Sequence, residues 1–187
     1  MKVYFKLCVS VLIWILVGGC SQLTVRVEDM LPAQVVKPQS VIDKTLAVAP
    51  VLGGEPSESL TRVIVNVNNT EYTEAVRQAL GSMGLFREVR SGGQGDLILH
   101  TQIISQKATV GSAVYTLLVH YDVRDSSSGH VLWRGNFYSQ VSAYDLKDQS
   151  SVSDWFPRVR ARTVQDNLNQ FITALIKELP TVISRTT

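Results

Sequence analysis

Cysteine and histidine are the residue types in this chain whose side chains most readily do chemistry, and both are scarce. Cys8 lies inside an almost unbroken apolar run over residues 7–17, and Cys20 follows directly after a pair of glycines. With two lysines before it, this run is typical of a secretory signal peptide over residues 1–19. It is too short for a permanent membrane span, which needs roughly 20 apolar residues. Cys20 is therefore the candidate residue for covalent chemistry.

The stretch Val17-Gly18-Gly19-Cys20 resembles the lipobox of bacterial lipoproteins, in which an aliphatic residue and two small residues precede a cysteine. The resemblance implies that Cys20 receives a thioether-linked diacylglycerol, that cleavage falls before it, and that its new amine is acylated, for example with palmitate. Each buried acyl methylene contributes about 0.8 kcal/mol, so two or more chains make a stable membrane anchor. A plain signal peptide with a chance cysteine, or a short membrane anchor, are the alternatives.

Charge and cysteine usage exclude several classes of function. The chain has 18 basic and 16 acidic side chains, but Lys2 and Lys6 leave with the signal, so the mature chain is formally neutral. A neutral chain has no electrostatic footprint for nucleic acid. Once Cys8 is removed and Cys20 is modified, no thiol remains for a disulfide, for thiol catalysis or for a cysteine-based metal site.

The remaining candidates for chemistry form no recognisable site. His120 and His130 flank one predicted hairpin, with Asp122 as a third ligand nearby, but surface histidines on strands explain them better than a metal site does. The acids Asp96 and Asp125 are scattered, and the sequence has no Gly-x-Ser-x-Gly nucleophile motif. We therefore expect no catalytic residues, no metal, no cofactor and no enzyme activity.

The elements that position these residues follow from apolar periodicity. The pattern predicts helices over 70–84, with Thr70 as N-cap and Gly84 as C-terminal stop, and over 158–179, ended by Pro180. Period-two alternation predicts an antiparallel meander of three strands, over 96–106, 113–125 and 131–143. Shorter strands are predicted over 45–51 and 60–67, with a strand or connector over 87–90. The fold class is α+β: a two-layer sandwich in which two amphipathic helices cover one face of a mainly antiparallel sheet.

One domain is expected, over residues 44–180, with a tail over 181–187. Residues 20–43 hold Cys20 and a tether with two prolines and no sustained periodicity. A tether of this length lets the domain stand off the membrane, although four of its apolar residues could dock on the domain: Val25, Val27, Met30 and Leu31.

Trp155, Phe156, Arg158 and Arg162 are candidate contacts for a partner or a lipid. The aromatic pair precedes the last helix, where it would either staple the chain to the core or form an exposed docking patch. The two arginines share one helix face at i, i+4 and would meet an anionic lipid or an acidic partner, or simply be solvated and balanced by nearby aspartates.

The whole layout resembles small bacterial envelope lipoproteins, a group with YajG-type lipoproteins, auxiliary lipoproteins of ABC-type transport systems and the periplasmic domain of the curli secretion channel lipoprotein. The motifs that carry the resemblance are weak: residues 79–90, then Gly95-Asp96-Leu97-Ile98-Leu99, the 129–133 hairpin segment and the closing helix. No catalytic residue is implied.

These observations predict a non-enzymatic, membrane-anchored lipoprotein that binds or assembles components of the bacterial envelope within a secretion or transport complex. The alternative is an auxiliary subunit of an ABC-type transport system, binding a lipid or small ligand between sheet and helices. Sorting of Gram-negative lipoproteins depends, by resemblance, on the residue after the modified cysteine, where Asp retains them in the inner membrane. Ser21 stands there, so we expect the outer membrane, facing the periplasm, and an envelope protein as partner.

Overall fold

The computed structural model describes residues 25–33, 37–54, 66–109, 111–146 and 155–186. The predicted signal peptide, Cys20 and most of the predicted 60–67 strand lie outside these residues. The described elements, in chain order, are α2 (Val27–Met30), β1 (Ile42–Val48), α4 (Asn69–Met83), β2 (Phe86–Ser91), β3 (Leu97–Thr109), β4 (Val114–Asp125), β5 (Val131–Ser142), the 3₁₀ turn η1 (Ala143–Asp145) and α5 (Trp155–Thr186).

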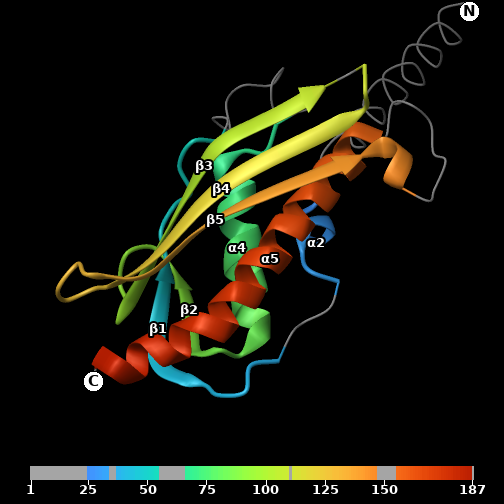
Figure 1. Cartoon of the computed structure of the whole chain (residues 1–187). Helices are drawn as coiled ribbons and strands as arrows, with labels where there is room; N and C mark the ends of the chain where they lie inside the picture. Colours follow the sequence, from blue (N-terminus) through green and yellow to red (C-terminus); the bar gives the residue numbers. More distant parts are fainter. Residues whose placement is uncertain (1–24, 34–36, 55–65, 110, 147–154, 187) are drawn as a thin grey trace, which may run out of the picture.

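The sheet has five strands in the order β2-β1-β3-β4-β5 (Figure 1). β3, β4 and β5 form the predicted antiparallel meander. β1 lies in the interior of the sheet and pairs parallel with both β2 and β3, so the sheet is mixed, and the parallel half was not predicted. Parallel neighbours need a crossover connection, and α4 supplies one between β1 and β2.

One face of the sheet carries the core. The alternating residues of β4 predicted to face inward are all fully buried: Tyr115, Leu117, Val119, Tyr121 and Val123. The predicted stripe of α5 is buried as well: Val164, Leu168, Phe171, Ile172, Leu175 and Leu179. Tyr72 of α4 reaches Tyr121 of β4 and Asn167 of α5, so both long helices pack on the same face, as the α+β prediction requires.

α4 matches its prediction closely at its C-terminus and less closely at its N-terminus. Gly84 ends the helix with φ 69°, in the left-handed region that glycine adopts without strain. The N-cap is Asn68 rather than Thr70, and its side-chain oxygen accepts a bond from the Glu71 amide at 2.7 Å. Asn and Thr are both good N-caps, and the helix begins two residues earlier than predicted because Asn68 makes the capping bond.

The last helix is longer than predicted at both ends. α5 begins at Trp155 instead of Arg158 and continues through Pro180 to Thr186, so the predicted stop at Pro180 and the predicted tail over 181–187 were wrong. An internal proline loses a backbone hydrogen bond and costs about 3 kcal/mol. Leu179 is fully buried and Ile183 packs on the core, and these contacts on both sides of Pro180 offset that cost.

The chain before β1 is docked on the domain in its described part. Val25 and Met30 are buried, and Met30 is part of the hydrophobic core. The Gln165 side chain donates to the Leu31 carbonyl at 2.6 Å. The docking that the sequence allowed is therefore present, and residues 25–31 do not act as free tether. Across the described residues, no helix combines the length and apolar character that crossing a membrane requires.

Candidate functional site

Trp155 and Phe156 form the first turn of α5. Their rings stack with centroids 3.6 Å apart and planes 26° apart. Both side chains are half-buried, and Trp155 packs against the core. Trp155 thus has the stapling contact proposed for this pair, while both rings keep part of their surface in solvent.

Arg158 and Arg162 follow on the exposed surface of the same helix. Arg162 donates to the Gln165 side chain and lies 3.4 Å from Asp166, one turn along. An exposed pair of this kind contributes about 0.3–0.5 kcal/mol. Asp166, one of the aspartates predicted to balance these arginines, therefore pairs with Arg162. The structure places Arg158 and Arg162 near the aromatic pair, on the same helix.

Arg160, which lies between these two arginines in the sequence, is not exposed. Its side chain is buried, and its guanidinium Nη1 donates to the Asn66 carbonyl at 2.7 Å. Burial raises the pKa of Glu71, and the nearby positive charge of Arg160 opposes that increase. Residues two positions apart lie on nearly opposite faces of a helix with 3.6 residues per turn, so Arg160 points inward between its two exposed neighbours.

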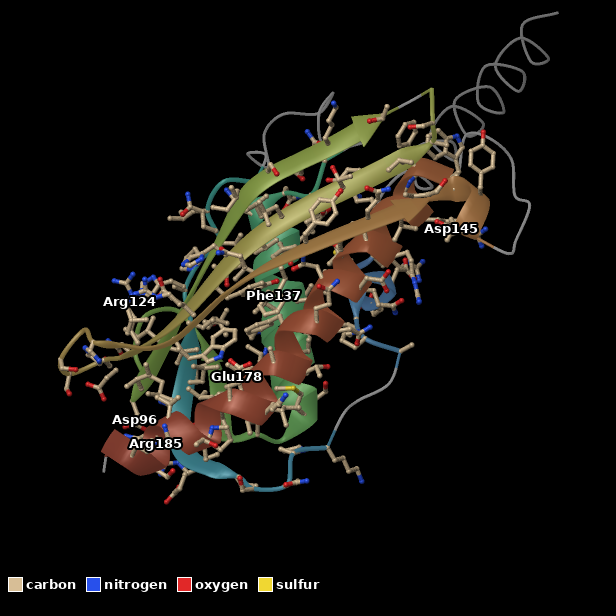
Figure 2. All side chains as sticks on the ribbon, viewed as in Figure 1. Asp96, Arg124, Phe137, Asp145, Glu178 and Arg185 are labelled. Carbon is tan, nitrogen blue, oxygen red and sulfur yellow. The ribbon has the colours of Figure 1, made fainter. Side chains whose placement is uncertain are left out.

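The face of the sheet opposite the helices carries a compact polar group on β4. Arg124 donates two hydrogen bonds to Asp122, at 2.7 and 2.9 Å. His120 Nε2 lies 3.7 Å from the same carboxylate, and its Nδ1 is 2.7 Å from the Asn136 side-chain oxygen. The hydrogen bonds from Arg124 lower the pKa of the Asp122 carboxyl despite its burial. Arg124 lies at the outer side of the sheet in Figure 2.

A shallow cavity of about 180 Å³ opens beside this polar group, lined by Pro50, Leu52, His100, Thr101, Gln102, His120, Asp122 and Arg124. His120 pairs opposite Asn136, not beside His130, which lies at the exposed hairpin turn. Among the residues that the structure describes, no group of three His, Cys, Asp or Glu side chains is placed to hold a metal ion. The Asp122 carboxylate is engaged by Arg124, so the polar groups that line the cavity around it are His100, His120 and Arg124.

Two apolar side chains are exposed on the same outer face. Ile104 of β3 is 51% exposed and Tyr138 of β5 is 54% exposed. The contacts of α4 and α5 with the sheet lie on the other face, and neither helix covers these residues. Together, Ile104, Tyr138 and the polar group of His120, Asp122 and Arg124 form what we call the outer-face surface.

A buried polar network joins the two layers of the fold. The hydroxyls of Tyr72 and Tyr121 are 2.6 Å apart, and each lies within 3.0 Å of the Asn167 side-chain oxygen. The Asn167 amide donates to the Phe137 carbonyl at 2.8 Å. Asn167 lies in the apolar stripe of α5, three residues after Val164, and a polar residue at such a position was the signal that sequence reasoning overlooked.

The chemistry of this network is structural. Burial raises the pKa of both phenols, Tyr72 and Tyr121, so both stay neutral across the physiological range. The Tyr121 ring also stacks on Phe171 of α5 with centroids 4.0 Å apart. At this point the layer between sheet and helices, where a ligand site was predicted, is filled by side chains. Figure 2 shows Phe137 in this region, between β5 and α5.

Comparison with known proteins identifies the fold. No family model matches the sequence, and no curated protein sequence matches it. Protein XCC0632 from Xanthomonas campestris, described as a DUF330 family protein, has a similar structure with a TM-score of 0.56 at 13% identity, over 82% of this chain and 92% of that one. Protein CT253 from Chlamydia trachomatis has a TM-score of 0.54 at 14% identity, over 74% and 98%.

A third solved structure extends the comparison. It is a proposed homologue of a neuraminyllactose-binding hemagglutinin from Helicobacter pylori, with a TM-score of 0.51 at 8% identity, over 85% of this chain and 99% of that one. Identities this low show a shared fold and no shared activity. The chain therefore has a small α+β fold that also occurs in these three bacterial proteins.

Proposed function

We propose that this chain is a lipid-anchored, non-enzymatic protein of the bacterial envelope that binds or positions another envelope protein. The observation that carries the proposal is the outer-face surface, where Ile104 and Tyr138 are half exposed on the same face of the sheet as the Asp122–Arg124 pair. Aromatic and apolar side chains next to polar groups are typical of protein interfaces. The Val17-Gly18-Gly19-Cys20 motif supports the lipid anchor, and Ser21 supports the outer membrane, facing the periplasm.

The state of the ionisable groups supports a binding role over catalysis. Asp122 is held as a carboxylate by two hydrogen bonds from Arg124. Tyr72 and Tyr121 are committed to the buried network. A catalytic acid or base needs a pKa matched to its task and access to a substrate. The pKa of Asp122 is lowered, and Tyr72 and Tyr121 are buried away from any substrate. YajG-type or transport-auxiliary membership remains part of the proposal, carried by the weak sequence motifs alone.

The test is site-specific photo-crosslinking in intact cells. A photoreactive amino acid replaces Tyr138 or Ile104 on the outer face, and a control replaces Val41, which is also exposed but lies beside the C-terminal end of α5. A discrete protein adduct from positions 138 and 104, absent from position 41, is the expected result. Identical patterns at all three positions, or no adduct, would refute a binding role for this face.

The cavity beside Asp122 favours a second candidate, an auxiliary subunit that binds a small polar ligand or a lipid head group. Its volume of about 180 Å³ suits a small group, and Arg124 and His120 offer donors at its rim. Mass spectrometry of lipids and small molecules that copurify with the membrane-extracted protein separates the two candidates. A stoichiometric ligand that is lost in Arg124→Gln would favour the second, and a protein adduct without such a ligand favours the first.

A further inference from the structure

We propose that one end of the domain, formed by η1 and the first turn of α5, lies on the lipid surface with Tyr144, Trp155 and Phe156 in the head-group region. We call these three residues the aromatic end. The proposal rests on the lipid anchor at Cys20 and adds an orientation to it. The occupant of this surface is a lipid bilayer, because the lipid anchor at Cys20 lies shortly before the docked part of the chain.

The described chain runs along α5 in a known direction. The Leu31 carbonyl accepts a bond from Gln165, in the N-terminal half of the helix. Residues 40–44 line a cavity with Pro180, Ile183 and Ser184 near the helix C-terminus. The described chain therefore lies beside the first half of α5 at Leu31 and beside its last turns at residues 40–44. Traced backwards from Leu31, the path leads away from the C-terminal end and toward the start of α5, as Figure 1 shows for α2.

Few residues lie between the proposed anchor at Cys20 and the docked residue Val25. Val25 is 8% exposed and belongs to the hydrophobic core. Val25 lies five positions after Cys20, and an extended chain covers at most about 3.6 Å per position, or roughly 18 Å in total. A free segment from residue 20 to the start of β1 would reach roughly 80 Å at the same spacing. The docked segment therefore keeps the domain close to the bilayer.

The end of the domain nearest to this short link has the side chains that membrane interfaces favour. Tyr144 of η1 is 83% exposed. η1 contacts α5, whose first residues Trp155 and Phe156 keep part of their stacked rings in solvent. Tyr and Trp settle at the head-group level because their rings are apolar with a polar edge.

Charge at this end is mixed, so the aromatic side chains carry the contact. Arg158 and Arg162 are exposed on α5, while Glu28, Asp29 and Asp145 are exposed on α2 and η1. Opposite signs in one region give no strong attraction to an anionic surface. Binding to neutral lipid is therefore expected to orient the domain as well as binding to anionic lipid does.

The length of the sheet supplies an internal control. β5 runs from Val131 to Ser142, which is roughly 37 Å at 3.4 Å per residue. η1 follows one end of β5, and the exposed hairpin turn at residues 126–129 precedes the other. Figure 1 shows this turn and the start of α5 at opposite ends of the molecule. If the aromatic end lies on the bilayer, the hairpin turn is in water.

The test uses the full-length protein, expressed and processed in a Gram-negative host, and reconstituted in phosphatidylcholine vesicles. Its mature form has no free thiol once Cys20 is modified, so Tyr144→Cys and Ser128→Cys each accept one nitroxide label. Electron paramagnetic resonance measures collisions of the label with oxygen, which is enriched in the bilayer, and with a water-soluble nickel chelate. The oxygen-to-nickel ratio should be at least about threefold higher at position 144. Equal ratios in vesicle-bound protein would overturn the proposed orientation.

Intrinsic fluorescence gives a second measurement without a label. The mature chain has two tryptophans, Trp133 and Trp155. In Trp133→Phe, brominated phosphatidylcholine should quench the remaining Trp155, whereas in Trp155→Phe it should leave Trp133 unquenched. Equal quenching in both variants contradicts the orientation. Failure of the wild-type protein to float with vesicles refutes the lipid anchor itself, and the orientation with it.

Discussion

The buried network of Tyr72, Tyr121 and Asn167 makes a quantitative prediction about stability. The two phenol hydroxyls supply two hydrogens for three close contacts. One contact joins the two hydroxyls, and the other two join each hydroxyl to the Asn167 side-chain oxygen. Asn167→Leu leaves one hydroxyl hydrogen and the Phe137 carbonyl without their partners. Each buried group that loses its partner costs about 1–3 kcal/mol, so we expect a loss of roughly 2–6 kcal/mol in the free energy of unfolding.

A double-mutant cycle separates this reason from a packing defect. In a Tyr72→Phe, Tyr121→Phe background neither hydroxyl is present. Asn167→Leu then leaves only the Phe137 carbonyl without its partner, and the free energy of unfolding falls by about 1–3 kcal/mol. The coupling between the amide and the two phenols is therefore about 1–3 kcal/mol. Either phenylalanine substitution alone removes one bond and should cost about 0.5–1.5 kcal/mol.

Urea unfolding of a soluble chain that starts at Ser21, followed by circular dichroism and tryptophan fluorescence, measures each term. The tyrosine pKa values are raised by burial above the ordinary value of 10.0, so the unfolded chain loses these protons first as pH rises. The contribution of the two neutral tyrosines to the free energy of unfolding is complete below about pH 10 and decreases above it. The double phenylalanine variant should not show this decrease. If Asn167→Leu cost the same in both backgrounds, within about 0.5 kcal/mol, the hydrogen-bond explanation would be wrong.

Three further predictions concern other parts of the chain. Trp133→Ala should cost about 3–5 kcal/mol by urea unfolding, since Trp133 is buried and stacks near Phe137; a loss under about 1 kcal/mol would contradict its core position. The lowered pKa of Asp122 adds stability above the ordinary value of 3.8 that is lost as pH falls below it. Asp122→Asn should therefore flatten the acid limb of the stability curve, and an unchanged limb would argue against the pairing. Cys20→Ser should abolish fatty-acid labelling, and equal label on both proteins would disprove this. Ser21→Asp should move the protein to the inner-membrane fraction on a density gradient, and an unchanged position would mean that another residue determines its membrane.

Local patterns in the sequence determined most of the elements. The strict alternation of β4 assigned every buried apolar residue of that strand, because a strand covered by helices on one face must alternate. Gly84 ended α4 as predicted, since its left-handed conformation has a local cause. The three-strand meander followed from period and from the turn after Asp125. The Val17-Gly18-Gly19-Cys20 motif is likewise local, and it is the basis of the proposed anchor.

Tertiary structure decided what local patterns could not. The parallel pairing of β1 with β2 and β3 depends on how a helical crossover packs, which no single strand encodes. α5 continues through Pro180 because Leu179 and Ile183 bury apolar surface on both sides of it, and a rule based on proline alone ignores such contacts. Val25 and Met30 dock because the helices present an apolar site for them. The burial of Arg160 and the convergence of Tyr72, Tyr121 and Asn167 have the same reason: residues far apart in the chain meet only when the layers pack.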